Sequence, residues 1–325
     1  MKKLIAEAPD RVVVAEVPLP VVSSDQVLIR SVRSLISPGS ELNRVRRLPG
    51  DPDSKWPNHD LGYAVAGEIV ELGSAVTGWA VGERVVAMQH HQEFVLAPAA
   101  GDATRTPVRL PDAVCWDDAP FVCWGRSCWN WTRKAEIQVG ETVAVMGLGL
   151  VGLLMVMWSR LRGPHRIIGL DLDQSRLDLA AKVGCDELVN CSEADAVEAV
   201  SRITGGKLAD CTLHCAAGPH VEAFETSQQI TRHQGRVVLI GIHSRPLTVL
   251  CNEFLWKDLL GGCTDYDMSP ERFAEATKLL ETGRLPVREI VTHNVPYQQA
   301  PAIYEMLNFR SHEAGAVLLR WGDGL

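Results

Sequence analysis

One short segment near the middle of the chain constrains the fold more than any other. Gly147-Leu148-Gly149-Leu150-Val151-Gly152 directly follows the strand-like run 142–146 and precedes residues 153–160, whose composition suits a helix. A second strand-like run, 166–171, ends in Asp171 and is followed by a helical pattern over 174–183. A G-x-G-x-x-G motif in this strand–turn–helix–strand context, with an acid about 20 residues on, predicts a dinucleotide-binding unit.

The residue types in this unit suit a dinucleotide for physical reasons. The three glycines allow a tight turn and a close backbone approach to a pyrophosphate, whose charge the helix N-terminus attracts. Asp171 would accept hydrogen bonds from ribose hydroxyls and repel a 2′-phosphate, so NAD is favoured over NADP. Arg176, five residues on, could soften that preference. The alternatives are a glycine-rich turn that binds nothing and an Asp171 that only caps a helix.

Strand and helix candidates continue to alternate after Asp171. Further strand candidates are residues 208–215, 235–240 and 247–250. This alternation predicts an α/β unit with a parallel sheet. The apolar run from Thr142 to Trp158 is then a buried strand and a packed helix, since it is glycine-interrupted and a little short for a membrane span.

The flanking stretches predict a second, different domain. Up to about residue 127, short β-branched runs punctuated by Gly, Pro, Asp and Ser favour a small barrel or sandwich. These runs are residues 12–14, 27–29, 65–72, 84–88 and 94–96. From about Cys263 the pattern predicts helices over 269–282 and 301–308 and a closing strand over 316–319. We expect a dinucleotide domain at 128–262 and a catalytic domain formed by 1–127 and 263–325.

Composition and charge exclude several classes of protein. Hydrophobic residues make up 46% of the 325, which excludes a disordered chain, and the net charge is 32 − 40 = −8. This acidic balance argues against a nucleic-acid binder and against attachment to an anionic membrane. No apolar segment follows Met1-Lys2-Lys3, so we expect no signal peptide. All nine cysteines lie between Cys115 and Cys263 without a CxxC pair, which predicts reduced thiols in a cytoplasmic protein.

Two adjoining segments, residues 65–73 (VAGEIVELG) and 76–85 (VTGWAVGERV), are similar to the first-domain signature of a known superfamily. It is that of the medium-chain dehydrogenase/reductases, which includes the zinc alcohol dehydrogenases and the quinone reductases. The resemblance covers nearly the whole chain. It implies an α/β protein with a Rossmann doubly wound parallel sheet and a GroES-like β-barrel catalytic domain. It also implies that residues 238–241 and 260–262 flank the nicotinamide. The candidate cofactor-binding residues are Gly147, Gly149, Leu150, Val151, Gly152, Asp171, Arg176, Cys215, Gly241, Ile242 and Ser127.

The chain departs from the superfamily where its zinc enzymes carry their ligands. Pro38 stands where a Cys is expected, Tyr63 and Ala64 replace a His-Glu pair, and only Cys123 remains as a candidate third ligand. Zinc needs three protein ligands drawn from Cys, His or carboxylate, so we predict no catalytic zinc. The loop of four cysteines that holds the structural zinc is also missing, so we predict no zinc there either. Residues 37–41 (SPGSE) with Gly62-Tyr63 resemble a zinc-poor subgroup that includes bacteriochlorophyllide dehydrogenase-like proteins.

Without zinc, a side chain must hydrogen-bond the alkoxide that develops as a secondary alcohol is oxidised. The resemblance places Tyr63 near the reacting carbon, although it could also merely fill the space left by the metal. Ser40 matches the hydroxyl that relays the alcohol proton, with turn chemistry as its alternative role. Glu41 could orient a neighbour or act as the base, or it could simply begin a helix.

The remaining candidates are histidines and residues of the expected cleft wall. His59, and equally His90 and His91, could serve as a general base, although lone histidines are more often structural. Substrate contact is predicted for Trp124, Cys123 and His91. Trp124 could stack on the substrate or pack in the core. The basic run Arg44, Arg46 and Arg47 could attract an acidic substrate, but a solvated helix face is its default role.

These observations predict an NAD-dependent, zinc-independent dehydrogenase or ketoreductase. It would interconvert a secondary alcohol and a ketone on a polyol, a sugar-like compound or a specialised metabolite. A zinc-free NAD(P)H-dependent reductase of activated C=C bonds is the alternative, against which Asp171 argues because such relatives usually prefer NADPH. A non-catalytic NAD-binding protein is the third possibility. The resemblance also implies a homodimer.

Overall fold

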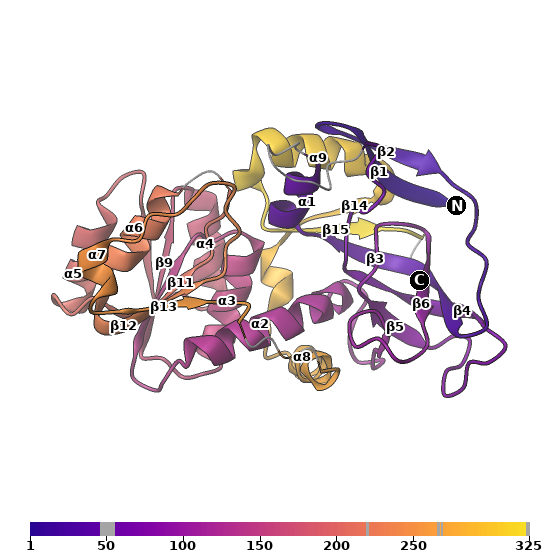
Figure 1. Cartoon of the computed structure of the whole chain (residues 1–325), viewed down its shortest axis with the longest axis horizontal. Coiled ribbons are helices and arrows are strands. Elements are labelled where there is room, and N and C mark those ends of the chain that lie inside the picture. The colour runs from indigo at the N-terminus through magenta and orange to yellow at the C-terminus, as the bar shows by residue number, and fades with distance from the viewer. Residues whose placement is uncertain (46–55, 219–220, 265–266, 268, 323–325) are drawn as a thin grey trace. The chain divides into compact units, whose positions relative to one another are not determined.

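The computed structural model describes residues 1–45, 56–218, 221–264, 267 and 269–322, without the side chains of Asn43 and Arg44 (Figure 1). The chain divides into two compact units. Unit 1 comprises Met1–Arg126, Asp267–Ser311 and Ala316–Leu325, and unit 2 comprises Ser127–Tyr266 and His312–Gly315. The expected domain limits were residues 127 and 262, so unit 2 begins one residue earlier and also includes residues 263–266 and 312–315.

Unit 2 is built on a six-stranded, wholly parallel sheet. In sheet order its strands are β10 (Glu187–Asn190), β9 (Arg166–Asp171), β8 (Thr142–Met146), β11 (Ala209–His214), β12 (Thr231–Leu239) and β13 (Asp258–Gly261). The helices are α3 (Leu150–Arg160), α4 (Gln174–Lys182), α5 (Ala196–Thr204), α6 (Glu222–Gln229) and α7 (Cys251–Phe254), with α2 (Val122–Ala135) leading into the unit. The chain runs from β8 outward to one edge and from β11 outward to the other, which is the predicted doubly wound Rossmann order. Helices lie on both faces of the sheet (Figure 1).

Several elements of unit 2 differ from the sequence prediction: β12, for example, begins at Thr231 rather than at residue 235, and β13 was not predicted as a strand. Helix α3 begins at Leu150 rather than at residue 153, because Gly149 is extended and is already its N-cap. Residues 247–250 do not form a strand: β13 occupies the place beside β12, and the Thr248 carbonyl oxygen accepts a hydrogen bond from the Gln228 side chain. Edge strand β10 was not predicted, since its four residues include only two apolar ones.

Unit 1 is mostly β, as predicted. Its seven-stranded sheet runs β14-β15-β3-β4-β5-β7, with β6 pairing β3, and β1 and β2 form a separate antiparallel pair. The strands are β1 (Lys2–Ala8), β2 (Arg11–Glu16), β3 (Gln26–Ile36), β4 (Val65–Leu72), β5 (Arg84–Ala87), β6 (Phe94–Pro98), β7 (Val108–Arg109), β14 (Val291–Pro296) and β15 (Ala316–Arg320). The helices are α1 (Pro38–Val45), α8 (Glu271–Glu281) and α9 (Ala300–Phe309), with single turns at Ala119–Phe121, Val287–Ile290, Tyr297–Gln299 and Ser311–Glu313.

The pairing of β3 with β4 positions the candidate active site. These strands are antiparallel, with Ser34 opposite Val65, and the Leu35 amide donates to the Ala64 carbonyl oxygen at 3.0 Å. The same register continues beyond the strand ends, so Ser37 after β3 comes beside Tyr63 before β4. Buried Val27, Ile29, Val65 and Ile69 form the core beneath this pair of strands.

Within the described residues, no helix is long and apolar enough to cross a membrane.

Candidate active site and cofactor site

Tyr63, the residue expected to handle the substrate proton, meets a hydroxyl group that the sequence analysis did not single out. The Tyr63 phenol donates a 2.5 Å hydrogen bond to Ser37 Oγ. Ser37 is buried, whereas Tyr63 is only partly buried. A phenol oriented in this way can exchange a proton with an oxygen atom placed beside it.

Trp124 packs against the Tyr63 ring. The ring centroids are 5.5 Å apart and the planes are tilted by 56°. Trp124 lies in the first turn of α2 and is 5% exposed, and its Nε1 donor has no hydrogen-bond partner among the described residues. A buried donor without a partner costs about 1–3 kcal/mol. Because this nitrogen atom is itself buried, contact of Trp124 with the substrate stays a prediction.

The three positions that carry ligands in zinc enzymes do not suit zinc here. Pro38 has no donor atom in its side chain, and the Tyr63 phenol is engaged with Ser37. The Cys123 thiol donates to the Ala87 carbonyl oxygen at 3.6 Å, and burial raises the pKa of this thiol to about 12. No three His, Cys, Asp or Glu side chains in the described part of the chain are grouped as a metal site.

Glu41 and His91 belong to a buried polar cluster rather than to a substrate surface. Both side chains are completely buried, and His91 Nε2 lies 3.2 Å from Glu41 Oε2. Glu41 also accepts hydrogen bonds from the Ser37 amide and from the Tyr304 hydroxyl. Neither side chain has exposed surface to offer a ligand, which favours an orienting role over the role of base for Glu41 and a structural role over substrate contact for His91.

The other candidates of unit 1 occupy varied places. Ser40 is partly buried in the first turn of α1, and His59 is exposed outside the cluster. His90 is partly buried, with Nδ1 3.0 Å from the Gly62 carbonyl oxygen and Nε2 3.4 Å from Asp60. Arg46 and Arg47 lie outside the described residues, as does the side chain of Arg44.

In unit 2, the glycines of the motif permit close packing at the carboxyl ends of the strands. Gly147 has φ +87°, and a Cβ there would lie 2.6 Å from the Ala216 amide nitrogen. A Cβ on Gly152 would lie 1.9 Å from the Gly147 carbonyl oxygen, and one on Gly241 would lie 1.7 Å from the Ala216 carbonyl oxygen. A Cβ on Gly149 would meet nothing within 4 Å. This glycine therefore leaves open space at the start of α3, where Leu150 and Val151 follow and the helix dipole favours an anion.

Asp171 holds the glycine-rich turn from the end of β9. Its Oδ2 accepts the Leu148 amide at 2.6 Å, and its Oδ1 accepts the Leu172 amide at 2.8 Å and the Asp173 amide at 3.1 Å. Arg176 Nη1 lies 3.7 Å from Oδ2. A carboxylate offers about four lone-pair positions, so Asp171 can brace the turn and still accept a ribose hydroxyl.

The remaining cofactor candidates differ in accessibility. Cys215 is buried and burial raises the pKa of its thiol, whereas Ile242 is exposed and Ser127 is partly buried. Next to Cys215, His214 Nε2 lies 2.9 Å from His243 Nε2, and His214 Nδ1 lies 2.8 Å from Ser227 Oγ. Burial, with a smaller contribution from the charge of His243, lowers the pKa of His214 to about 3. No local sequence pattern predicts this histidine pair, because residues 214 and 243 lie 29 positions apart and only the fold brings them together.

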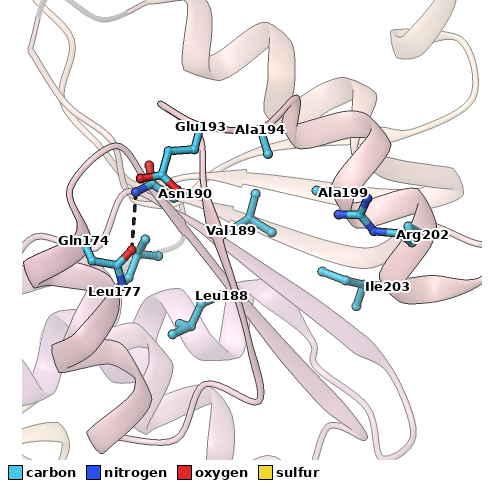
Figure 2. A pocket seen from close by; sticks show the side chains of 10 residues that line it. All are labelled: Gln174, Leu177, Leu188, Val189, Asn190, Glu193, Ala194, Ala199, Arg202 and Ile203. Atoms are coloured by element: carbon cyan, nitrogen blue, oxygen red, sulfur yellow. Dashed lines mark hydrogen bonds between the residues drawn. The ribbon is translucent and has the colours of Figure 1, made fainter.

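A cavity of about 320 Å³ lies along edge strand β10, between α4 and α5 (Figure 2). Gln174 and Asn190 face each other at one end through a 3.4 Å hydrogen bond, and Arg202 and Ile203 line the other end. Its lining contains none of the candidate catalytic residues, so we do not assign the reaction to it.

Two family descriptions match this chain. Residues 23–107 match the alcohol dehydrogenase GroES-like domain, and residues 151–282 match the zinc-binding dehydrogenase family. The chain belongs to the medium-chain dehydrogenase/reductase superfamily. This medium-chain dehydrogenase/reductase combines the predicted Rossmann and GroES-like folds, and its superfamily consists of NAD(P)-dependent oxidoreductases.

Relatives of this medium-chain dehydrogenase/reductase act on alcohols. It is 27% identical over 363 residues to an alcohol dehydrogenase of Cupriavidus necator, with 94% of each chain covered. It is 32% identical over 167 residues, 50% of this chain and 44% of the relative, to an erythritol/L-threitol dehydrogenase of Mycolicibacterium smegmatis. A solved zinc-binding dehydrogenase of Sinorhizobium meliloti bound to NADP has a TM-score of 0.83 at 22% identity, covering 98% of both chains. The relatives support an enzyme that interconverts alcohols and ketones.

Proposed function

We propose that this protein is an NAD-dependent, zinc-independent oxidoreductase that interconverts a secondary alcohol and a ketone. The observation that carries the proposal is the Tyr63–Ser37 hydrogen bond, made by a residue that, by the resemblance, replaces a zinc ligand of the superfamily. Pro38 has no donor atom and the Tyr63 phenol is a poor zinc ligand, so Cys123 alone does not make a ligand set there. Hydrogen bonds from side chains would therefore polarise the substrate oxygen, as the metal does in the zinc enzymes.

In the proposed reaction the bound nicotinamide supplies or accepts the hydride. Tyr63 gives a proton to the ketone oxygen in reduction, or accepts the hydroxyl proton in oxidation. The Trp124 ring packs against the Tyr63 ring and would help to keep the phenol in place. Ser40 and the exposed His59 stay candidates for carrying the proton onward to water.

NAD is the proposed cofactor because of the charge at the end of β9. Asp171 is held in place by three backbone amides and would repel a 2′-phosphate. Arg176, 3.7 Å from Asp171, partly balances this charge, and the solved S. meliloti relative binds NADP. The proposal is thus a preference for NAD that a comparison of the two cofactors will measure.

The proposed substrate is a polyol, a sugar-like compound or another specialised metabolite. Support comes from the erythritol/L-threitol dehydrogenase among the relatives. The proposed setting is the cytoplasm, in line with nine cysteines that are all free thiols.

We propose that two copies of the chain pair through unit 2. Phe254, Leu255 and Trp256 are each more than half exposed and directly precede edge strand β13. Large apolar side chains beside an uncovered strand edge favour association. Leu255→Glu should give monomers at micromolar concentration by light scattering, whereas Val139→Glu, at a position 85% exposed, should leave the dimer intact. A Leu255→Glu dimer would contradict this interface.

The test of the proposed function is NADH formation from NAD with a panel of secondary alcohols, polyols and cyclitols in the presence of a strong zinc chelator. Turnover that survives the chelator supports a metal-free alcohol dehydrogenase. If no alcohol of the panel gives NADH but the protein reduces enones with NADPH, the protein is a C=C reductase rather than an alcohol dehydrogenase. Tight cofactor binding without any turnover would replace it by a non-catalytic NAD-binding protein.

A further inference from the structure

Ser37 is held through its backbone as well as through its hydroxyl group. Its Oγ accepts the Tyr63 phenol at 2.5 Å, and its amide donates to Glu41 Oε1 at 2.7 Å. The Glu41 amide donates in turn to the Ser37 carbonyl oxygen at 2.9 Å, so the two residues bond each other across the start of α1. Ser37 thereby links the partly exposed phenol to a carboxylate in the interior of unit 1.

Distant segments of the chain anchor the Glu41 carboxylate. The Tyr304 hydroxyl, from α9, donates to Oε2, and His91 Nε2 lies 3.2 Å from the same oxygen. Burial by itself would raise the pKa of Glu41, but the charge of His91 and the hydrogen bonds of His91, Tyr304 and Ser37 outweigh it and lower this pKa. The carboxylate is therefore ionised at neutral pH, and a buried charge of this kind depends on keeping its donors.

The His91 ring is fixed and also supports the backbone before Tyr63. Its Nδ1 lies 2.8 Å from Ser34 Oγ, which accepts the Trp321 indole N–H at 2.8 Å. A Cβ on Gly62, whose φ is +87°, would lie 2.6 Å from this ring. The cluster therefore fixes both partners of the 2.5 Å bond, Ser37 through its amide and Tyr63 through the preceding glycine.

We propose that Ser37 is a positioning residue for proton transfer at Tyr63, and that buried Glu41 fixes Ser37 for this task. The inference rests on the proposed function. In reduction, the ketone carbon would take a hydride from bound NADH, which becomes NAD⁺, and the ketone oxygen would take the Tyr63 phenol proton, which leaves a tyrosinate. Ser37 Oγ, an acceptor before the transfer, then turns its own proton toward the phenolate oxygen. The tyrosinate regains a proton from water, so protons and charge balance over one turnover.

The first test compares two buried serines. Ser37→Ala should lower kcat at least about tenfold and leave the KM of both substrates within about twofold, because the lost contact matters in the transition state. Ser31→Ala is the matched control: Ser31 is 2% exposed and its Oγ donates to the Gln92 carbonyl oxygen at 2.5 Å. It should lose stability to a similar extent and keep its kcat.

The second test examines Glu41. Glu41→Gln retains an acceptor for the Ser37 amide and should keep kcat within about threefold, whereas Glu41→Ala should lower it as much as Ser37→Ala. Tyr304→Phe removes another donor from the same carboxylate but keeps the acceptor of the Ser37 amide, so it should lower the melting temperature and lower kcat less than Glu41→Ala does. In a crystal structure of the Glu41→Ala variant, the Tyr63–Ser37 oxygen distance should exceed the hydrogen-bonding limit of about 3.5 Å, a readout independent of activity.

The outcomes separate this inference from the proposed function. Full activity of Tyr63→Phe would remove the proton-transfer role and the inference together. If Tyr63→Phe is inactive but Ser37→Ala is fully active, only the inference about Ser37 is overturned. The same holds if kcat falls in Ser40→Ala but not in Ser37→Ala. If kcat falls equally in Glu41→Ala and in Tyr304→Phe, Glu41 has only a structural role and does not act specifically through Ser37.

Discussion

The Leu148 amide donates a 2.6 Å hydrogen bond to Asp171 Oδ2 and so ties the glycine-rich turn after β8 to the end of β9. The residue proposed to choose the cofactor thus also shapes the turn that receives its pyrophosphate. Cofactor affinity and local stability should therefore change together when Asp171 is replaced.

Asp171→Asn should weaken NAD binding about tenfold and lower the melting temperature, because charge-assisted bonds to backbone amides become neutral ones. The ratio of kcat/KM for NAD to that for NADP should fall. Cofactor titration and steady-state kinetics measure both. Asp178→Asn, at an exposed residue that contacts Gln174, is the control. An unchanged cofactor ratio would refute the role of Asp171 in selectivity.

Tyr63→Phe should lower kcat by at least about a hundredfold, since it removes the proton that the reaction exchanges while keeping the ring against Trp124. The dissociation constant for NAD, measured by fluorescence quenching, should stay within about twofold. Tyr297→Phe, at a tyrosine stacked on Trp321, should leave kcat unchanged. Retained turnover in Tyr63→Phe would show that another group handles the proton.

Metal removal should not affect the reaction. We expect less than about 0.1 zinc per chain by elemental analysis and a rate within about twofold of the untreated value after phenanthroline, because Pro38, Tyr63 and Cys123 do not form a zinc ligand set. A zinc alcohol dehydrogenase treated in parallel should lose its activity. A rate that the chelator abolishes and added zinc restores would contradict the metal-free site.

His214 should make the protein less stable as the pH falls below 6.5. Its folded pKa of about 3 lies below the ordinary value of 6.5, so between these values only the unfolded chain takes up the proton. The free energy of unfolding should therefore drop by about 1 kcal/mol between pH 7.5 and 5.5 from this group alone. Urea unfolding of His214→Gln should show a smaller drop, and exposed His233→Gln should behave like the wild type.

Local sequence patterns predicted unit 2 well because its strands and helices alternate along the chain and its central strands are buried apolar runs. Strands β8 and β9 and the glycine motif between them have the predicted limits. The wrong predictions lie at the edges of the sheet. Strand β10 is too short to give a periodic signal. Residues 247–250 have the composition of a strand, but β13 already pairs with β12.

The candidate active site was predicted only in part. Tyr63 was identified because it replaces a metal ligand of the superfamily, but its partner Ser37 was not identified. The two residues lie 26 positions apart, and only the antiparallel register of β3 and β4 brings them together. The burial of Glu41 and His91 was also missed, since Ser34, Tyr304 and Trp321 come from three other segments.

By itself the sequence determined the doubly wound unit and the glycine-rich turn that Asp171 holds, whereas the absence of zinc stays a prediction. These follow from residue identity and from short-range order along the chain, where glycine, proline and periodic burial act locally. Only the tertiary structure decided which polar groups meet. Ser37 with Tyr63, Glu41 with Tyr304, and His214 with His243 are paired by strand register and packing between distant segments, because a buried polar group must find its partner wherever the fold places one.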